Sequence, residues 1–218
     1  DMIASGPAYP DRSTAADAHA VVDKYNLQLS PDMLALLDRP TPAALDNVET
    51  HITGSVRELC SAAAAECRAL GYETHILTAS LGCEAREAGS FLASVAQYHA
   101  DTEKPLAFIA GGETVVHITG TGKGGRNQEL ALSAARGIAG MDNALIFSVG
   151  SDGTDGPTDA AGGLVTGEFA ARCREKGLSI EKTLADNDAY NLLRQTDGLI
   201  VTGPTGTNVC DLTLLLVK

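Results

Sequence analysis

Two glycine-rich segments of this chain carry the residue types that phosphate and metal chemistry needs. The first, residues 120–129, reads Gly-Thr-Gly-Lys-Gly-Gly-Arg-Asn-Gln-Glu, and the second, residues 150–163, contains Asp152, Asp155 and Asp159. The first segment follows an apolar, strand-like run and precedes a helix-like one, so its amide groups can point at an anion from a helix N-terminus. Cations, amides and carboxylates at neighbouring strand ends therefore predict phosphate and Mg²⁺ chemistry.

The glycines of residues 120–125 match the Gly-x-Gly-x-x-Gly fingerprint of dinucleotide-binding sites. Such a site also needs an acidic residue at the end of the next strand, where it binds the ribose. Here Asp142 precedes that strand and Asp152 follows it on a glycine-rich loop. The fingerprint alone is therefore a weak match, and a plain glycine-rich connection with solvated cations is the alternative.

Two cations, Lys123 and Arg126, lie in the same turn. They suit a transferring phosphoryl group better than a nicotinamide pyrophosphate. The segment is not a Walker A motif, because neither Ser nor Thr follows Lys123. We interpret the turn as a binding site for a phosphoryl group.

Asp152, Asp155 and Asp159 are spaced by three and four residues. Asp-Gly and Asp-x-x-Gly are also ordinary turn sequences, which is the alternative interpretation. Beside a cationic loop, oxygen-only ligands of this kind suit Mg²⁺. Asp152 comes first after the strand, so we expect it at the reacting centre, because strand carboxyl ends face the ligand crevice in open α/β sheets.

Two shorter motifs are less specific. Residues 203–209 lie between two strand-like runs, and Asn208 within them could orient a substrate hydroxyl or a phosphate, although a simple hairpin is the more ordinary interpretation. Glu113, in the Gly-Gly-Glu-Thr stretch 111–114, suits a structural salt bridge and a functional role equally well.

Composition limits the class of partner. The chain has 218 residues, 44% of them hydrophobic, and a formal net charge of -12, which predicts a globular protein that repels nucleic acid and anionic lipid. No apolar run is long enough to span a membrane. The five cysteines are odd in number and none forms a Cys-x-x-Cys pair, which favours a reducing, cytoplasmic location.

Apolar spacing predicts two helices at residues 15–25 and 31–37, and the Arg-Pro-Thr-Pro stretch 39–42 then marks the best domain boundary. Beyond it, strand and helix patterns alternate, which predicts an α/β layered sandwich with a mostly parallel sheet that may be mixed near residues 111–113, and glycine-rich loops at strand ends. The expected strands are 48–53, 73–78, 106–110, 114–119, 144–149, 199–202 and 212–217, and the expected helices are 55–70, 84–98, 127–138, 167–176, 180–184 and 189–194.

Taken together, five ordered motifs resemble the class II glycerate 2-kinase family, whose C-terminal part is called the MOFRL domain. They are Ile-Ala-Ser-Gly-Pro at 3–7, Gly-Gly-Glu-Thr at 111–114, Gly-Gly-Arg-Asn-Gln-Glu at 124–129, the aspartate-rich run 151–163 and Gly-Thr-Asn at 206–208. The resemblance implies residues 1–45 as the tail of an N-terminal domain plus a helical linker. It implies residues 46–218 as the C-terminal α/β domain, with a MOFRL core at about 105–211.

The resemblance also implies ATP- and Mg²⁺-dependent phosphorylation of D-glycerate to 2-phosphoglycerate in a cleft between two domains. The residues carried over from the family's motifs are Arg126, Asp152 and Asn208, which are expected to be catalytic. From the glycine-rich segments themselves, Gly122, Lys123, Gly124, Gly125 and Thr154 are expected to bind the nucleotide, and Asp152 and Asp155 are expected to bind Mg²⁺.

The resemblance implies that the family's N-terminal domain, with its active-site lysine, precedes Asp1 and is missing here, which leaves the activity of the chain alone open. Two other functions stay open: an NAD(P)H-dependent hydroxypyruvate reductase, and a non-catalytic binding or homodimerisation module.

Overall fold

The computed structural model describes residues 11, 13–40, 42, 44–49 and 51–218. The chain divides into two compact units, Asp1–Thr53 and Gly54–Lys218. The motif at residues 3–7 and Thr41 of the expected boundary lie outside the described residues. Among the helices of the described ranges, none combines the length and the apolar character that crossing a bilayer requires.

The first unit contains two short helices, α2 (Ala15–Lys24) and α3 (Pro31–Leu37), which confirm the two helices expected there. Thr14 begins α2 with a capping box, in which its hydroxyl accepts from the backbone of Asp17 and the Asp17 carboxylate accepts from the backbone of Thr14. Neither helix buries a residue. Local capping rather than a core therefore defines this pair.

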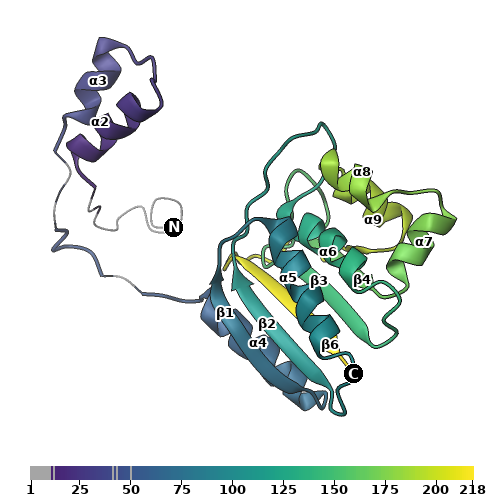
Figure 1. The fold of residues 1–218 in the computed structure, drawn as a ribbon. Helices are drawn as coiled ribbons and strands as arrows, with labels where there is room; N and C mark the ends of the chain where they lie inside the picture. Colours follow the sequence, from purple (N-terminus) through teal and green to yellow (C-terminus); the bar gives the residue numbers. More distant parts are fainter. Residues whose placement is uncertain (1–10, 12, 41, 43, 50) are drawn as a thin grey trace. The chain divides into compact units, whose positions relative to one another are not determined.

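The second unit is built on a six-stranded sheet with the order β1-β2-β6-β3-β4-β5 (Figure 1). The strands are β1 (Glu73–Leu81), β2 (Leu106–Gly112), β3 (Ala144–Gly150), β4 (Gly162–Thr166), β5 (Leu199–Ile200) and β6 (Asp211–Val217). The α/β class and the mixed sheet are confirmed.

The expectation that most strand pairs are parallel is wrong. Within the described ranges only β1 and β2 pair in parallel, and the four other pairs are antiparallel. The reason is the position of β6, which lies between β2 and β3 and runs antiparallel to both. The alternation of strand and helix does give β1, β2 and β3 one common direction, but the inserted strand separates β2 from β3.

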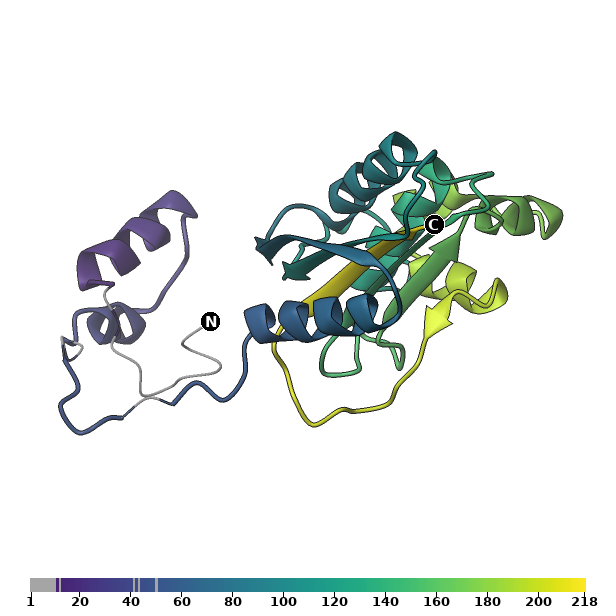
Figure 2. The ribbon, with the colours of Figure 1, turned by 90° about the horizontal axis from the view of Figure 1, so that it is seen from below.

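Helices cover both faces of the sheet (Figure 2). Helix α4 (Val56–Ala69) lies on one face, where Cys60, Ala64 and Cys67 pack with strand residues that include Ile109 and Leu214. Helices α5 (Ala85–Tyr98) and α6 (Arg126–Gly137) lie on the other face. The connecting helices α7 (Phe169–Glu175), α8 (Ile180–Ala185) and α9 (Ala189–Gln195) extend that second layer.

The packing of α5 against α6 depends on small residues. A Cβ atom at Gly89 would lie 2.2 Å from the carbonyl oxygen of Leu130, so only glycine allows the two helices to approach this closely. Helix α6 is buried along most of its length, from Asn127 to Ala135. This burial holds the start of α6 in a fixed place beneath the site.

Four local features differ from the expectation. No strand forms at residues 48, 49 and 51–53, the described part of the expected strand 48–53, and residues 114–119 are irregular apart from a single bridge between Glu84 and Val115. Strand β4 was missed, because its glycine-rich start lacks a strand pattern. Residues 203–209 are not a hairpin turn, since β5 and β6 lie apart in the sheet.

Candidate functional site

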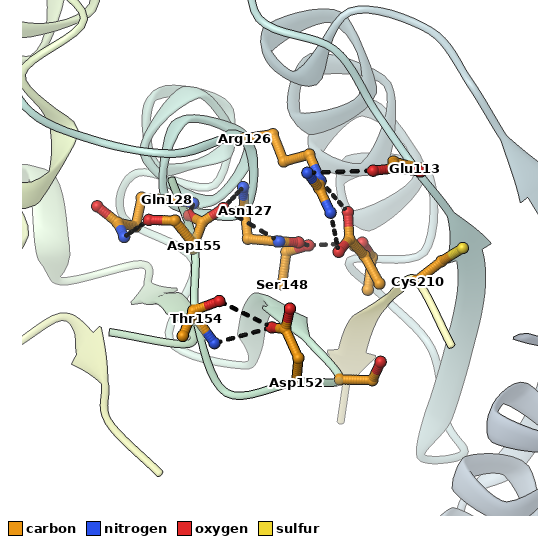
Figure 3. Close-up of polar contacts among 12 residues, drawn as sticks. Glu113, Arg126, Asn127, Gln128, Ser148, Asp152, Thr154, Asp155 and Cys210 are labelled. Atoms are coloured by element: carbon orange, nitrogen blue, oxygen red, sulfur yellow. Dashed lines mark hydrogen bonds and ion pairs between the residues drawn. The ribbon is translucent and has the colours of Figure 1, made fainter. Parts of the chain in front are cut away.

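The polar residues expected to do chemistry meet where β3 ends and β6 begins, beside the first turn of α6 (Figure 3). Gly150, the last residue of β3, pairs with Asp211, the first residue of β6. Arg126 opens α6, and its side chain reaches Asp211. Residues far apart in the sequence therefore share one end of the sheet.

Asp211 and Glu113 fix the guanidinium of Arg126. Nε and Nη2 of Arg126 donate to Oδ2 and Oδ1 of Asp211 at 2.6 and 2.9 Å, and Nη1 lies 3.3 Å from Oε1 of Glu113. The Asp211 side chain is 6% exposed and that of Arg126 is 33% exposed. The hydrogen bonds to Asp211 raise the pKa of Arg126 above its ordinary value, so the guanidinium stays charged. This two-point contact sets its orientation as well as its charge.

Asp152 and Thr154 lie in the loop after β3, and Asn208 reaches Asp152 from the loop that precedes β6. Oδ1 of Asp152 accepts from the backbone N and the hydroxyl of Thr154 at 2.9 and 3.1 Å, and Oδ2 accepts from Nδ2 of Asn208 at 3.2 Å. The structure thus brings together two of the expected catalytic residues and one expected nucleotide-binding residue.

Several backbone contacts hold the loop of residues 203–210 against the loop that begins at Ser151. The carbonyl of Asp152 accepts from the backbone N of Thr205 at 3.1 Å, and the Ser151 hydroxyl accepts from the backbone N of Val209 at 2.7 Å. Cys210 adopts a φ of 66°, which is unusual for a residue other than glycine, and its carbonyl accepts from Ser151 N at 3.0 Å. These contacts place Asn208 beside Asp152.

Gly150 leaves space beside two carboxylates, those of Asp152 and Asp211. A Cβ atom at this position would lie 2.5 Å from the carbonyl oxygen of Thr154, 3.2 Å from Oδ1 of Asp152 and 3.7 Å from Oδ1 of Asp211. Any side chain at Gly150 would displace this loop. The carboxylates of Asp152 and Asp211 therefore both lie close to one glycine.

Asp155 makes no hydrogen bond to Arg126, Asp152 or Asp211 and caps helix α6 instead. Its Oδ1 accepts from the backbone N and Nδ2 of Asn127 at 3.1 and 3.3 Å, and its Oδ2 accepts from the backbone N of Gln128 at 2.8 Å. The residue is 2% exposed, and burial raises its pKa to about 6. Asp155 supplies the N-terminal cap that Gly125, as the N-cap residue, cannot supply.

A buried chain of hydrogen bonds continues from this cap into the sheet. The Ser148 hydroxyl donates to Oδ1 of Asn127 at 2.5 Å and lies 2.8 Å from the hydroxyl of Thr213. Ser148 is on β3 and Thr213 is on β6, two residues beyond Asp211. The chain therefore ties the start of α6 to the same two strands that carry the site.

The first glycine-rich segment does not offer its amides to a ligand in the way the sequence suggested. All five backbone N–H groups of residues 119–123 donate to one short segment, 186–188. The pairs are Thr119 and Gly120 to Asn187 Oδ1 (2.8 and 2.9 Å), Thr121 to Asp186 Oδ1 (2.9 Å), Gly122 to the carbonyl of Asp186 (2.8 Å) and Lys123 to Asp188 Oδ1 (2.9 Å). The chain itself supplies the acceptors that a phosphate would supply.

The amides that remain belong to Gly124, Gly125 and Arg126. Within the described part of the chain, no acceptor lies in hydrogen-bonding range of these three backbone N–H groups. They lie between the bound amides of residues 119–123 and those that Asp155 binds at the start of α6. The expected anion site is thus narrowed to three residues beside the Arg126 guanidinium.

Lys123 is turned toward a different group of residues. Its Nζ lies over the ring of Tyr190, 4.6 Å from the ring centroid, and the hydroxyl of Tyr190 donates to Oδ1 of Asp159 at 2.7 Å. That hydrogen bond lowers the pKa of Asp159. Lys123 and Asp159 therefore belong to the α9 side of the molecule rather than to the group around Arg126.

The expected Mg²⁺ pair fits only in part. Both oxygens of the Asp155 carboxylate accept N–H groups and the residue is buried, so it does not fit as a metal ligand. Asp152 fits better, because it is only half-buried at the sheet end. Over the described ranges, no three His, Cys, Asp or Glu residues are grouped to hold a metal ion.

Sequence reasoning missed Asp211 and the segment 186–188. Asp211 had one available signal, since it is a lone carboxylate at the head of an otherwise apolar strand-like run. The Asp-Asn-Asp run at 186–188 has the composition of an ordinary turn, so its pairing with a distant glycine segment has no local signature. Glu113, for which structure and function were equally open, does form a salt bridge.

Residues 106–211 match the MOFRL family, and residues 1–38 match a domain of unknown function (DUF4147). The chain is 48% identical, over its full length, to D-glycerate 2-kinase of Thermotoga maritima, of which it covers 53%. It is 30% identical to glycerate kinase of Macaca fascicularis and covers 69% of that protein.

A crystal structure of glycerate kinase from Thermotoga maritima matches with a TM-score of 0.86 and 47% identity, over 99% of this chain and 53% of that protein. The chain therefore spans about half the length of the bacterial relative and of its solved structure.

Proposed function

This chain belongs to the glycerate 2-kinase family, and we propose that it supplies half of an active site that transfers a phosphoryl group from ATP to the 2-hydroxyl of D-glycerate, giving 2-phosphoglycerate. One observation carries the proposal. Arg126, Asp152 and Asn208, from three separate motifs of the family, gather at one end of the sheet. The preceding domain is proposed to supply the rest of the site.

Charge supports a requirement for Mg²⁺. The site contains one arginine, paired with Glu113 and Asp211, and a third carboxylate, that of Asp152. Such a group has a net negative charge and repels phosphate until a cation compensates it. A Mg²⁺ ion would be held by Asp152 together with phosphate oxygens of the nucleotide, where it neutralises the charge of the phosphates. ATP and Mg²⁺ are therefore proposed to bind together.

In the proposed reaction, the 2-hydroxyl oxygen of D-glycerate forms a bond to the γ-phosphorus and the bond to the ADP oxygen breaks. Arg126 stabilises the charge on the transferring group, because Asp211 aims its guanidinium at a fixed point. Asp152 accepts the proton of the 2-hydroxyl or, when it binds the cation, orients that hydroxyl while the proton passes to an oxygen of the transferred phosphoryl group. Asn208 and Thr154 hold the Asp152 carboxylate in place.

The three free amides of residues 124–126 are proposed to bind a phosphate oxygen at the start of α6. Gly122 and Lys123 are not part of this subsite, since their amides are bound by the segment 186–188. Gly124 and Gly125 are retained as nucleotide-binding residues. The amide subsite is small, as expected for a single phosphate.

The structure disfavours a hydroxypyruvate reductase that binds NAD(P)H through the Gly-x-Gly-x-x-Gly spelling. Dinucleotide binding needs a strand before the glycines and open amides within them. Residues 114–119 form no strand, and the amides of Gly120 and Gly122 are bound internally. The glycines of this motif let the backbone lie close to the segment 186–188 and do not serve cofactor binding.

The reaction is proposed for the cytoplasm, where the five free cysteines stay reduced. The test is ³¹P NMR of ATP, Mg²⁺ and D-glycerate, incubated with this chain and, separately, with the chain extended to the length of its relatives. We expect 2-phosphoglycerate with the extended protein only. Phosphoglycerate from neither sample would contradict the proposal, whereas binding of nucleotide without turnover would favour a binding or dimerisation module.

A further inference from the structure

The connection between α8 and α9 contains a buried side chain whose role the proposed reaction does not explain. Asn187 is 7% exposed and has a φ of 54°, so the backbone there is in the left-handed region. Its Oδ1 accepts from Thr119 N and Gly120 N, and its Nδ2 donates to the carbonyl of His117 at 3.2 Å. One amide side chain thus binds three backbone groups of the segment before α6.

A buried ion pair holds Asn187 from the other side. Nδ2 of Asn187 also donates to Oε2 of Glu129 at 3.0 Å, and Oε1 of Glu129 accepts from Nε and Nη2 of Arg86 at 3.0 and 2.8 Å. The Glu129 side chain is only 3% exposed. Asn187 therefore connects α5 and α6 to the glycine-rich segment through charge-assisted hydrogen bonds.

We propose that Asn187, held by Glu129 and Arg86, is a positioning residue that fixes residues 117–123 and thereby places Arg126 and the free amides of residues 124–126 for phosphoryl transfer. The inference rests on the proposed function. Asn187 touches neither substrate nor nucleotide in this scheme. It acts through the backbone, because residues 119–123 lead directly into the first turn of α6.

The geometry explains why the side chain must be asparagine. Oδ1 faces two N–H donors, and Nδ2 faces a carboxylate and a carbonyl, so the site needs one acceptor and one donor. Aspartate would keep the acceptor but would place a second carboxylate against Glu129. A purely apolar residue would leave the buried Glu129 oxygen without its partner.

The test compares Asn187→Gly with Asn143→Ala in the chain extended to the length of its relatives. Asn187→Gly removes the amide but keeps a residue that tolerates positive φ. Asn143 likewise donates a side-chain bond to a carbonyl, that of Ala100 at 2.8 Å, at the far end of β3. We expect Asn187→Gly to lower kcat about 10- to 100-fold with a small change in KM, because misplacement by about 1 Å has this effect. The control should keep kcat.

Hydrogen exchange supplies a readout that does not depend on activity. In this chain, Asn187→Gly should speed exchange of the Thr119 and Gly120 amides, while the Asn143→Ala variant leaves them protected. Unchanged protection, or fast exchange with normal kcat, would overturn the proposal. If the wild type transfers no phosphate, the proposed function fails, and exchange still decides whether Asn187 holds the segment.

A pair of charge-exchange variants covers the case in which Asn187→Gly does not fold. Asn187→Asp alone should lower kcat strongly, through repulsion of Glu129. Adding Glu129→Gln restores one donor and one acceptor between the two positions. Recovery of kcat in the double variant supports a positioning role, whereas equal loss in single and double variants contradicts it.

Discussion

The two glycine-rich segments have similar compositions and opposite uses. In residues 119–123 every backbone N–H is bound by the segment 186–188, so the glycines allow two stretches of chain to lie in close contact. In the loop after β3, Gly150 instead makes room for the carboxylates of Asp152 and Asp211. Glycine density therefore marks close approach of the backbone, and the acceptors nearby decide whether a ligand can bind there.

The largest expected effect concerns the second region. In the extended protein, Arg126→Ala and Asp152→Asn should each lower kcat about 100-fold or more, because each removes a charge placed for the transition state. Steady-state kinetics with ATP and D-glycerate measure the effect. The exposed residues Arg57 and Asp142 provide matched controls, Arg57→Ala and Asp142→Asn. Turnover near that of the controls would remove the residue concerned from the catalytic group.

Asp155, which belongs to the second region but caps helix α6, should make stability depend on pH. Burial raises its pKa from 3.8 to about 6, so the folded state binds a proton that the unfolded chain has already lost. The contribution to stability is fully present below pH ~4 and is lost as the pH rises through ~6, by on the order of 3 kcal/mol.

Urea unfolding from pH 4 to 7 measures this as the difference between wild type and Asp155→Asn. For Asp155→Asn, the difference in unfolding free energy from the wild type should change with pH. For the exposed control Asp142→Asn, the same difference should stay constant. A difference independent of pH would show that the Asp155 carboxyl does not titrate in this range.

The close contact between residues 119–123 and the segment 186–188 is tested by adding a methyl group at Gly122. A Cβ atom at Gly122 would lie 2.4 Å from Cβ of Asp188 and 2.5 Å from the carbonyl oxygen of Asp186, so Gly122→Ala should reduce the free energy of unfolding by about 2 kcal/mol. Gly82→Ala is the control, since its nearest neighbour would lie 3.9 Å away. Equal stability of the two variants would mean that the segments separate at little cost.

Cys210 should show the smallest effect. Its φ of 66° is unfavourable for a side chain with a Cβ atom, and it directly precedes Asp211. Cys210→Gly should be at least as stable as the wild type, whereas Cys210→Val, with a branched Cβ, should lose about 1 kcal/mol. Thermal unfolding with Cys83→Val as the control measures this. A Cys210→Val variant as stable as wild type would show that the conformation is not strained.

Most helices and strands of the second unit could be predicted from local patterns of apolar residues. The helices α4, α5 and α6 and the strands β1, β2 and β3 were expected from apolar spacing. All of them except β1 bury one face or a whole run, whereas the residues of β1 are exposed or half-buried. The place of β6 could not be inferred, because an apolar strand-like run carries no information about which neighbours it pairs with. Strand β4 was invisible for a related reason, since Gly162 and Gly163 give no alternation.

The candidate site, too, could be predicted from the sequence only in part. Sequence motifs predicted Arg126, Asp152 and Asn208 as site residues, and the structure brings them together at one end of the sheet. The partners that fix or occupy these motifs, Asp211 and the segment 186–188, come from distant positions whose local sequence is ordinary. Asp155 was expected to bind metal because carboxylate spacing does not reveal burial. Tertiary contacts decided each of these roles.

The insertion of β6 between β2 and β3 has a consequence for how the protein is made. This strand comes after the other five in the chain, yet it joins the pair β1–β2 to the group β3–β4–β5. During synthesis the two groups have no shared edge until the ribosome has released residues 211–217. Until then, the facing edges of β2 and β3 lack the strand that pairs with both, and they are open to wrong strand pairing.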